Sequence, residues 1–590
     1  MRKGWVKKAV PVLLAATMIF ALGACSSNNS KENASSGSPS SPAGSEASEQ
    51  SNSSGEVSKE EVTVTVWPVT FSQNFPSGVQ EDPVAIDIFE KTKIKIDVES
   101  HPTDEKFQAL MASSDLSDVI IPEGTTKYVQ QLIEGDNLID LEPYLEQYAP
   151  DILKNAADAI EYAKKYQSNG TGKLYFIPAG VLTQANEKIE NSAIIGPFLR
   201  WDYYQEIGAP ALNTYDDFLN AVAAMLEKHQ ENEDGQKFYG FSQWFDWDIW
   251  GIAMFPAWME GKDYFASGLY QVDHETLEME SMLTAEKSMM WLGVDFWNKA
   301  YKMGLLDPDA LTQKYDTAIQ KGSSNRVLAA IASWQLSGSN AVLSKAGHAD
   351  KGYTPVPLPI AGSKNIYSST SPFGNGRMWA VSKNAKSPER AVELINYFYN
   401  IDNAETLYNG IKGVDWNEEN GMKVQSQAQI DGLSNDPNYV LTSGAGKYTN
   451  IVGLAPGFIN PKNGETLLIR NREVTIANQS PLDKAMAAHY NVELPRDIVP
   501  PNQPLILNKM GIVTPFMATA TDDIKRIDDK ILNYVRSALA TMILTKDEAK
   551  YKAMKEEIIA KVKSMDYETS YNWYAEAFAK AKENAQPFLK

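Results

Sequence analysis

The sequence predicts an α/β fold for the body of this 590-residue chain. From about Val62 onward, short segments rich in β-branched residues at a period of two are followed by segments with apolar residues at helical spacing. Repetition of this alternation is typical of βαβ architecture. The body, from about Val62 to Lys590, is long enough for two or more lobes and a large core.

The first 25 residues have the pattern of a lipoprotein signal peptide. Four basic residues precede an apolar run of about 14 residues, which is shorter than the roughly 20 that a membrane-spanning helix needs. Small residues then lead to Cys25, the only cysteine of the chain. We expect removal of residues 1 to 24 and lipid attachment to Cys25. The alternative is an uncleaved anchor in which Cys25 is an ordinary small residue.

Residues 25 to 60 predict a disordered, Ser-rich tether. They are almost entirely Ser, Asn, Gly, Pro, Ala, Glu and Lys, with no large apolar side chain before Val57. Such a segment cannot bury enough apolar surface to offset the entropy lost on ordering. We expect it to hold the folded body away from the lipid; a binding tail is the alternative.

Charge and cysteine content exclude several classes of function. The formal net charge is −20, and loss of the four basic residues of the signal peptide moves it to −24. This negative charge argues against a nucleic-acid partner and against adsorption to anionic lipid, because both need a cationic protein surface. Simple solubility also explains the charge. With Cys25 lipidated, no thiol remains for a disulfide or a thiolate metal site.

The body begins with predicted βαβ units. The first strand covers residues 61 to 67, and Pro68 stops it. The elements that follow are a helix at 83 to 91, a strand at 93 to 98, a helix at 106 to 113, a strand at 118 to 121 and a helix at 127 to 134. Near the other end of the chain, apolar residues at helical spacing predict helices at 524 to 541, 546 to 563 and 571 to 579.

Four motifs, in this order, resemble those of the extracellular solute-binding proteins of ABC importers, the class containing maltodextrin-binding protein. They are a small-polar run with an aspartate before a strand, a Leu-x-Asp-Leu element, a lobe-crossing strand followed by two helices, and a second crossing strand with a Ser-Pro-Glu helix start. They lie at residues 110 to 120, 138 to 144, 198 to 218 and 380 to 391. The resemblance covers about residues 61 to 420 and is closest to large sugar-binding lipoproteins of Gram-positive bacteria.

This resemblance implies a two-lobed, periplasmic-binding-protein-like fold (type II) with a ligand cleft between the lobes. It places residues 61 to 193 plus 378 to 415 in the N-terminal lobe, and residues 198 to 375 plus 416 to 590 in the C-terminal lobe. It implies a lipid-anchored binding protein, not an enzyme and without a cofactor, on the extracellular face of the cell membrane. The expected partners are a carbohydrate, above all an oligosaccharide, and the permease subunits of an ABC transporter.

No catalytic signature in the sequence supports an enzyme. The chain lacks a Gly-x-Ser-x-Gly elbow, a His-Glu-x-x-His pair and a phosphate-binding loop, and its five histidines are too widely separated for zinc spacing. Its 75 acidic residues offer too many pairs to exclude glycoside hydrolysis. A surface-anchored glycosidase or lyase therefore stays the main alternative. A peptide-binding importer subunit is disfavoured, because the crossing motifs resemble the sugar-binding group.

One loop raises the question of calcium. Relatives that bind acidic oligosaccharides have loops resembling EF-hands at the position of Glu231 to Gly240. Here Asp234 and Gly235 are present, but the alternating ligands and the terminal acidic ligand are missing. We expect no metal and a plain acidic turn; a bound calcium ion is the alternative.

Residues 242 to 250 contain three tryptophans and two aspartates. An indole ring stacks on the CH groups of a sugar, and carboxylates accept hydrogen bonds from its hydroxyls. Core packing is the alternative, because Trp247, Trp250 and Met254 have helical spacing. The ligand-binding residues predicted from this segment are Trp244, Asp246, Trp247 and Trp250.

Loops at strand ends supply the other predicted contacts, because open α/β sheets bind ligands there. By the resemblance, these contacts are Trp67, Glu123, Trp334, Gln335, Arg377, Asp415 and Trp416. Four other tryptophans lie in helical patterns and are predicted to be core residues: Trp201, Trp291, Trp297 and Trp573.

Overall fold

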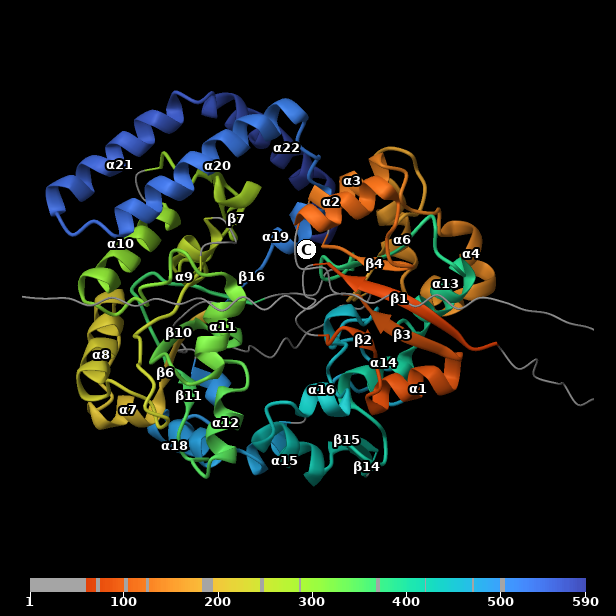
Figure 1. Cartoon of the computed structure of the whole chain (residues 1–590), viewed down its shortest axis with the longest axis horizontal. Helices are drawn as coiled ribbons and strands as arrows, with labels where there is room; N and C mark the ends of the chain where they lie inside the picture. The colour runs from red at the N-terminus through yellow and green to blue at the C-terminus, as the bar shows by residue number, and fades with distance from the viewer. Residues whose placement is uncertain are drawn as a thin grey trace, which may run out of the picture. The chain divides into compact units, whose positions relative to one another are not determined.

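The computed structural model describes residues 60–69, 75–99, 104–123, 127–182, 195–244, 249–285, 288–367, 372–419, 421–469, 472–498 and 505–589 (Figure 1). Residues Lys59–Lys590 form one compact unit. The predicted signal peptide, the lipidation site Cys25 and nearly all of the tether lie outside the described residues. No helix within the described ranges combines the length and apolar character needed to span a membrane.

The first sheet has the strand order β2-β3-β1-β4-β13-β5. Its centre is the predicted βαβ unit, in which β1 pairs in parallel with β3 and β4. Strand β13 returns antiparallel to β4, with Ala380 opposite Ile120. The strands are β1 (Val62–Pro68), β2 (Gly78–Val79), β3 (Ile94–Val98), β4 (Val119–Ile121), β5 (Ile177–Pro178) and β13 (Met378–Val381).

Asp118, the aspartate that precedes β4, has a structural role. Its Oδ2 accepts hydrogen bonds from the backbone N–H and the hydroxyl of Thr65, at 2.9 and 2.8 Å. Its Oδ1 accepts one from the N–H of Lys386, at 2.8 Å. One buried carboxylate thus ties β1, β4 and the segment after β13 together, and satisfies backbone donors that would otherwise be costly to bury.

Helices pack on this sheet and complete the first core, the set of buried residues that runs from Val64 to Leu182 and from Trp379 to Leu467. Helix α1 contacts β3, and α13 contacts β1 and β13 (Figure 1). The helices before and after the sheet strands are α1 (Pro83–Thr92), α2 (Asp104–Ser113), α3 (Lys127–Glu134), α4 (Glu142–Tyr148), α5 (Pro150–Asn155), α6 (Ala157–Tyr166), α13 (Pro388–Tyr397) and α14 (Ile401–Asn409).

The second sheet is smaller and lies in a separate core. Strand β6 (Ile195–Arg200) is buried along its whole length and pairs antiparallel with β10 (Ala329–Ala332) and β11 (Tyr353–Pro355). The second core runs from Ile195 to Tyr567. Its helices include α7 (Trp201–Glu206), α8 (Tyr215–Lys228), α9 (Trp250–Met259), α10 (Met289–Lys302), α18 (Pro481–Tyr490), α20 (Asp522–Ile543) and α21 (Glu548–Lys563). Helix α11 (Tyr315–Ser323) contacts the turn at residues 333 to 336, and α12 (Ser339–Lys345) contacts α11.

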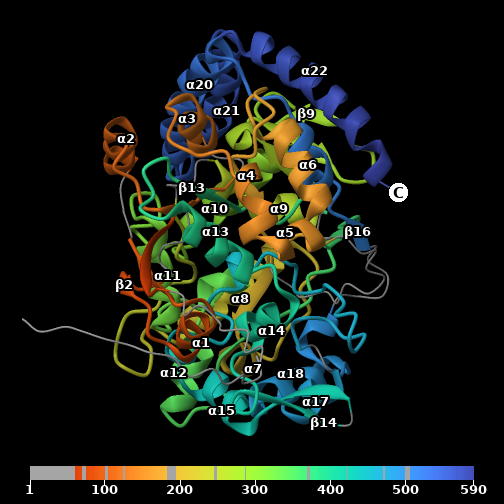
Figure 2. The same cartoon turned by 90° about the vertical axis from the view of Figure 1, so that its right-hand side faces the viewer.

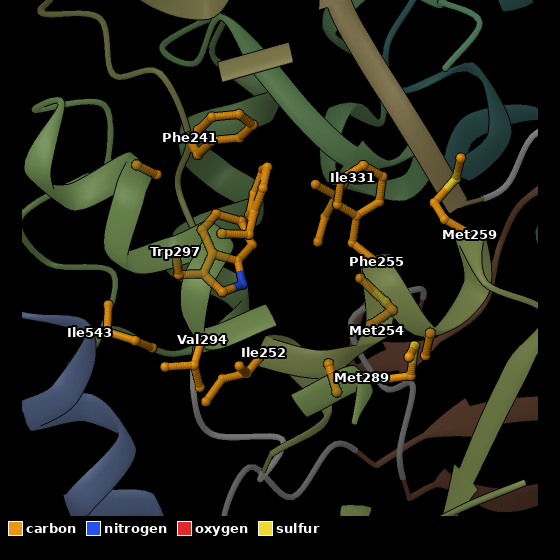
Figure 3. Close-up of a cluster of buried hydrophobic side chains, with 14 of the residues drawn as sticks. Phe241, Ile252, Met254, Phe255, Met259, Met289, Val294, Trp297, Ile331 and Ile543 are labelled. Atoms are coloured by element: carbon orange, nitrogen blue, oxygen red, sulfur yellow. The ribbon is translucent and has the colours of Figure 1, made fainter. Parts of the chain in front are cut away.

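Helices α9 and α10 approach each other closely at the centre of the second core. A Cβ atom on Gly293 would lie 2.1 Å from the carbonyl oxygen of Ile252, so this contact requires glycine. Figure 3 shows Ile252, Val294 and Ile543 side by side, the last from α20. Trp201, Trp291 and Trp297 are buried here, which confirms the prediction that they are core residues.

The C-terminal half does not follow the predicted lobe boundary. Residues 448 to 467 belong to the first core, although residues 416 to 590 were predicted to lie in the C-terminal lobe. The N–H groups of Gly180 and Val181 bond the carbonyls of Val452 and Gly453, each at 2.8 Å, and this pairing holds the segment beside β5. This part of the prediction was wrong. The observed placement of residues 448 to 467 depends on contacts between residues far apart in the chain, which local sequence patterns do not reveal.

Three further groups of elements complete the described chain. A three-stranded antiparallel sheet contains β7 (Lys262–Phe265), β8 (Tyr270–Asp273) and β9 (Met279–Ser281). Helix α22 (Tyr567–Ala585) lies beside α20 and α21 in both views (Figures 1 and 2). The rest are β12 (Asn365–Tyr367), β14 (Trp416–Glu419), β15 (Met422–Gln425), α15 (Gln427–Asn435), α16 (Tyr439–Ser443), α17 (Arg472–Ala477), β16 (Leu505–Leu507) and α19 (Met510–Val513).

Candidate functional site

One half-exposed ion pair lies where strand β4 ends and strand β13 begins in the first sheet. Strand β4 ends two residues before Glu123, and β13 begins directly after Arg377, so antiparallel pairing brings these two residues opposite each other. Their side chains form an ion pair at 3.1 Å and are 34% and 24% exposed. Burial lowers the pKa of the Arg377 guanidinium, while Glu123 acts in the opposite direction. Both predicted residues are therefore together, and both can reach a polar ligand.

Trp334 and Gln335 follow the second sheet in the same way. Strand β10 ends at Ala332, opposite Ile195, and a short 3₁₀ helix (Ser333–Leu336) carries both side chains. Trp334 is half-buried and packs against the second core. Gln335 is buried, and its Oε1 accepts the N–H groups of Ile331 and Ala332 at 2.8 and 3.1 Å. Gln335 thus positions the turn that carries Trp334 and is not itself accessible to a ligand.

A buried polar network supports this turn from below. Gln335 donates a hydrogen bond to Gln243 Oε1 at 3.2 Å, and Gln313 donates to the Gln243 carbonyl at 2.7 Å. The network ends in an ion pair between Lys321 Nζ and Asp307 Oδ2 at 2.6 Å. It fixes residues 242 to 244, which lead into the aromatic segment.

Gly322 lets α11 close over the network. A Cβ atom at this position would lie 1.9 Å from the Gln335 carbonyl oxygen. The close approach of α11 to the turn after β10 therefore requires glycine, and it places Lys321 over Asp307. Helix packing and charge pairing thus hold the same turn.

Four further predicted ligand contacts are also buried. Trp67 and Trp244 are 1% and 0% exposed, and Asp415 and Trp416 are also buried. Trp67 packs edge-on against Phe107, at 4.4 Å between ring centroids. Rings with so little exposed area present no face to a sugar, so these predictions are corrected.

The buried residues have structural tasks that explain their chemistry. Asp415 accepts hydrogen bonds from the Ile411 N–H and the Tyr439 hydroxyl, both at 2.7 Å. Trp416 donates its indole N–H to the carbonyl of Gly410 at 3.0 Å. Trp244 packs edge-on against Tyr315, at 5.0 Å between ring centroids. Aromatic and acidic residues at strand ends serve packing as well as binding, and sequence alone does not separate the two.

The rest of the aromatic segment is not placed. Asp246 and Trp247 lie outside the described residues, and Trp250 begins α9 without a described side chain. Their role stays a prediction.

Asp263 on β7 was not among the predicted site residues, although its side chain has an unusual environment. All four residues of this strand are half-exposed. The Asp263 side chain is 24% exposed, and its Oδ2 lies 3.8 Å from Nε2 of the fully buried His274. Burial raises the pKa of Asp263 to about 6 and lowers the pKa of His274 to about 4. The one sequence signal was a polar residue next to Tyr264 in a short strand after an apolar helix.

The loop that raised the calcium question is closed by its own side chains. Asn232 Oδ1 accepts the N–H groups of Asp234 and Gln236 at 3.1 and 2.8 Å. Glu233 pairs with the buried Arg200 guanidinium. Over the described ranges, His, Cys, Asp and Glu side chains form no group of three or more that could hold a metal ion.

The chain belongs to the bacterial extracellular solute-binding proteins, because the model of that family matches residues 71–405, which is more than half of its length. Among curated proteins it is similar to Lipoprotein LipO of Bacillus subtilis (strain 168). The two sequences are 22% identical over 387 residues, which is 63% of this chain and 70% of LipO.

Solved structures of solute-binding proteins share the two-lobed fold. The alginate-binding protein AlgQ2, solved without calcium, matches 88% of this chain and 98% of its own, with a TM-score of 0.54 and 15% identity. An EF-hand mutant of the Streptococcus pneumoniae ABC-transporter substrate-binding protein FusA, in complex with fructo-nystose, matches 89% and 99%, with a TM-score of 0.58 and 14% identity. The predicted α/β, periplasmic-binding-protein-like fold is thereby confirmed.

Proposed function

We propose that this protein is the carbohydrate-binding subunit of an ABC importer, which captures an oligosaccharide and delivers it to a membrane permease. Two observations support the proposal: a half-exposed ring, Trp334, follows a strand of the second sheet, and a half-exposed ion pair lies at strand ends of the first sheet. An indole stacks on a sugar face, and carboxylate and guanidinium groups bind its hydroxyls. Fold relatives named as alginate-binding, or solved with fructo-nystose, support this ligand class.

The binding mechanism follows from having two cores. We propose an N-terminal lobe built on the first core and a C-terminal lobe built on the second, with the ligand between them. A ligand that contacts Arg377 from one lobe and Trp334 from the other favours the closed form, because its binding energy depends on both. The closed form would then be the state that the permease recognises.

The anchor is a proposal of its own. Similarity to a lipoprotein supports lipid attachment at Cys25 on the extracellular face of the cell membrane. Replacing Cys25 with Ser should abolish incorporation of labelled palmitate in the native host and leave the melting temperature of the body unchanged. Wild-type protein that carries no lipid would contradict the anchor.

A thermal-shift screen with oligosaccharides tests the main proposal. A sugar at 100 times its Kd should stabilise the folded protein by about 2.7 kcal/mol. Chromatography of the same mixtures separates binding from cleavage by a glycosidase or lyase. Stabilisation with intact sugar supports the importer subunit, and cleaved sugar would establish the enzyme instead.

A further inference from the structure

Helix α15 lies against helix α12. The hydroxyl of Ser344 on α12 donates a hydrogen bond to Asn435 Oδ1, at the last residue of α15, at 2.5 Å. A Cβ atom on Gly338, just before α12, would lie 3.6 Å from the Cβ atom of Pro437, just after α15. Both ends of α12 therefore lie beside the C-terminal end of α15.

Helix α15 is attached to the first core. Its buried residue, Gln429, donates a hydrogen bond to the carbonyl of Asn409 at 2.7 Å. Asn409 is the last residue of α14, whose Leu407 and Tyr408 belong to the first core. Helix α16, which follows α15, contacts α1. Residues 427 to 443 are therefore held by the first core.

Helix α12 is attached to the turn that carries Trp334. The hydroxyl of Ser339, the first residue of α12, is buried and donates a hydrogen bond to the carbonyl of Leu336 at 2.5 Å. Leu336 is the last residue of the 3₁₀ helix that follows β10. A sugar stacked on Trp334 and bound to the first sheet would therefore also hold α12 near α15.

A third core joins the first and second cores elsewhere. This set of buried residues includes Tyr162 from α6 and Phe578 from α22. Helix α6 also packs into the first core, and α22 begins at Tyr567 in the second core. The Tyr162 ring stacks on Phe373, at 4.4 Å between ring centroids, and its hydroxyl donates to the carbonyl of Pro515 at 2.6 Å.

The third core and the α12–α15 contact differ in chemistry. The third core buries several aromatic rings, each of which is costly to expose to water. Helix α15, which is described in full, buries Gln429 alone, and its Leu433 side chain is 44% exposed. Figure 2 shows α22 at the upper end of the body, and α12 and α15 at the lower end. The α12–α15 contact can therefore separate at a smaller cost, at a distance from a third core that stays packed.

We propose that residues 427 to 443 form a latch between the two lobes. Helix α15 separates from α12 when the lobes open, and the contact forms again when a sugar is bound. The third core stays packed and serves as the pivot. This inference rests on the proposed function. A sugar that favours the closed form stabilises the latch, and by linkage the latch raises the affinity for the sugar.

A reversible crosslink tests whether α12 and α15 separate during binding. The variant Ser344→Cys/Asn435→Cys is made together with Cys25→Ser, so that the two new thiols are the only ones in the chain. A short bifunctional methanethiosulfonate reagent joins the two thiols, and a reducing agent releases them. The probe is the best binder among uncharged tetrasaccharides of glucose, galactose, mannose, xylose and fructose. The two single-cysteine variants, treated in the same way, are the controls.

Stopped-flow fluorescence should show that the crosslink slows sugar exchange. Crosslinking before the sugar is added should slow association by about tenfold or more, because the open form becomes rare. Crosslinking after binding should slow dissociation to a similar extent, and reduction should restore both rates. The single-cysteine variants should exchange sugar as the wild type does.

Complete crosslinking with unchanged exchange rates would overturn the latch and leave the proposed function standing. Failure of the two thiols to crosslink would do the same, because it would show that α12 and α15 do not lie together in solution. Failure of every tetrasaccharide to bind the wild type would overturn both the latch and the proposed function.

A single substitution gives a second readout. Asn435→Ala removes the hydrogen bond to Ser344 and should weaken sugar binding about threefold, with little change in melting temperature. Asn417→Ala, which changes an exposed asparagine on β14, should bind sugar as the wild type does. Calorimetry measures these affinities. Equal affinities of Asn435→Ala and the wild type would contradict the latch.

Discussion

The two cores use buried charge differently. In the first core, Lys447 Nζ pairs with Asp82 Oδ2 at 2.7 Å, which fastens residues 445 to 448 to the start of α1. In the second core, Lys321 pairs with Asp307 beneath the turn that carries Trp334. Both pairs are removed from water, but only the second lies under a proposed ligand contact. Buried charge therefore stabilises the fold in one core and supports the proposed binding surface in the other.

The tryptophans near the two cores also differ, in the exposure of their side chains. Trp67 and Trp379 are buried in the part of the chain built around the first sheet, whereas Trp334 stays half-exposed on the second core. The first sheet thus offers an ion pair at its edge, and the second core offers a ring. Under the proposed function, the two cores would therefore supply different kinds of contact to the sugar.

The largest expected effect comes from breaking the two buried ion pairs. Lys321→Ala and Lys447→Ala should each lower the free energy of unfolding by about 3 to 5 kcal/mol, because each leaves a buried carboxylate unpaired. Only Lys321→Ala should also weaken sugar binding in protein that remains folded. Urea denaturation and calorimetry measure the two quantities.

A surface pair provides the control for this comparison. Lys299 pairs with Asp216 at 2.6 Å with both side chains exposed, so Lys299→Ala should cost less than about 1 kcal/mol. If Lys321→Ala and Lys447→Ala left sugar affinity equally unchanged, the proposed difference between the cores would not exist.

The tryptophans allow a second comparison. Trp334→Ala should weaken sugar binding by about 1 to 3 kcal/mol, the scale of a lost stacking contact, with little change in stability. Trp67→Ala should instead lower stability by about 3 to 5 kcal/mol through a core cavity. Calorimetry and thermal melting distinguish these outcomes. A large loss of sugar affinity in folded Trp67→Ala would show that Trp67 contacts the ligand and contradict its assignment to the core.

The Asp263–His274 pair predicts opposing effects of pH on stability. The pKa of His274 is about 4 when folded and 6.5 when unfolded, so its contribution to stability is lost as pH falls through that window. The pKa of Asp263 is about 6 when folded and 3.8 when unfolded, so its contribution rises as pH falls. The two contributions largely cancel in the wild type.

Single variants should expose each contribution. Relative to the wild type, His274→Gln should gain about 2 kcal/mol between pH 7 and 4.5, and Asp263→Asn should lose a similar amount. Urea denaturation at both pH values measures this. Parallel pH profiles for the two variants would show that the groups do not titrate as the geometry indicates.

Local patterns in the sequence predicted the fold well. Helix α3 has the predicted bounds 127 to 134, and β1 is displaced by only one residue from its predicted bounds. Such elements are predictable because residue periodicity and a proline such as Pro68 determine local structure within a few positions. The site was predicted less well. Burial of Trp67 depends on Phe107, and the raised pKa of Asp263 depends on its burial beside His274. Such facts arise from tertiary contacts that no spacing rule contains.

Small-angle scattering with and without a bound sugar tests most directly whether the two cores close around one ligand. The uncharged tetrasaccharide that gives the largest thermal shift is added at saturation, and its integrity is checked by chromatography afterwards. We expect the radius of gyration to fall on binding, with the sugar recovered intact. Tight binding that leaves the scattering curve unchanged, or cleavage of the sugar, would contradict the account.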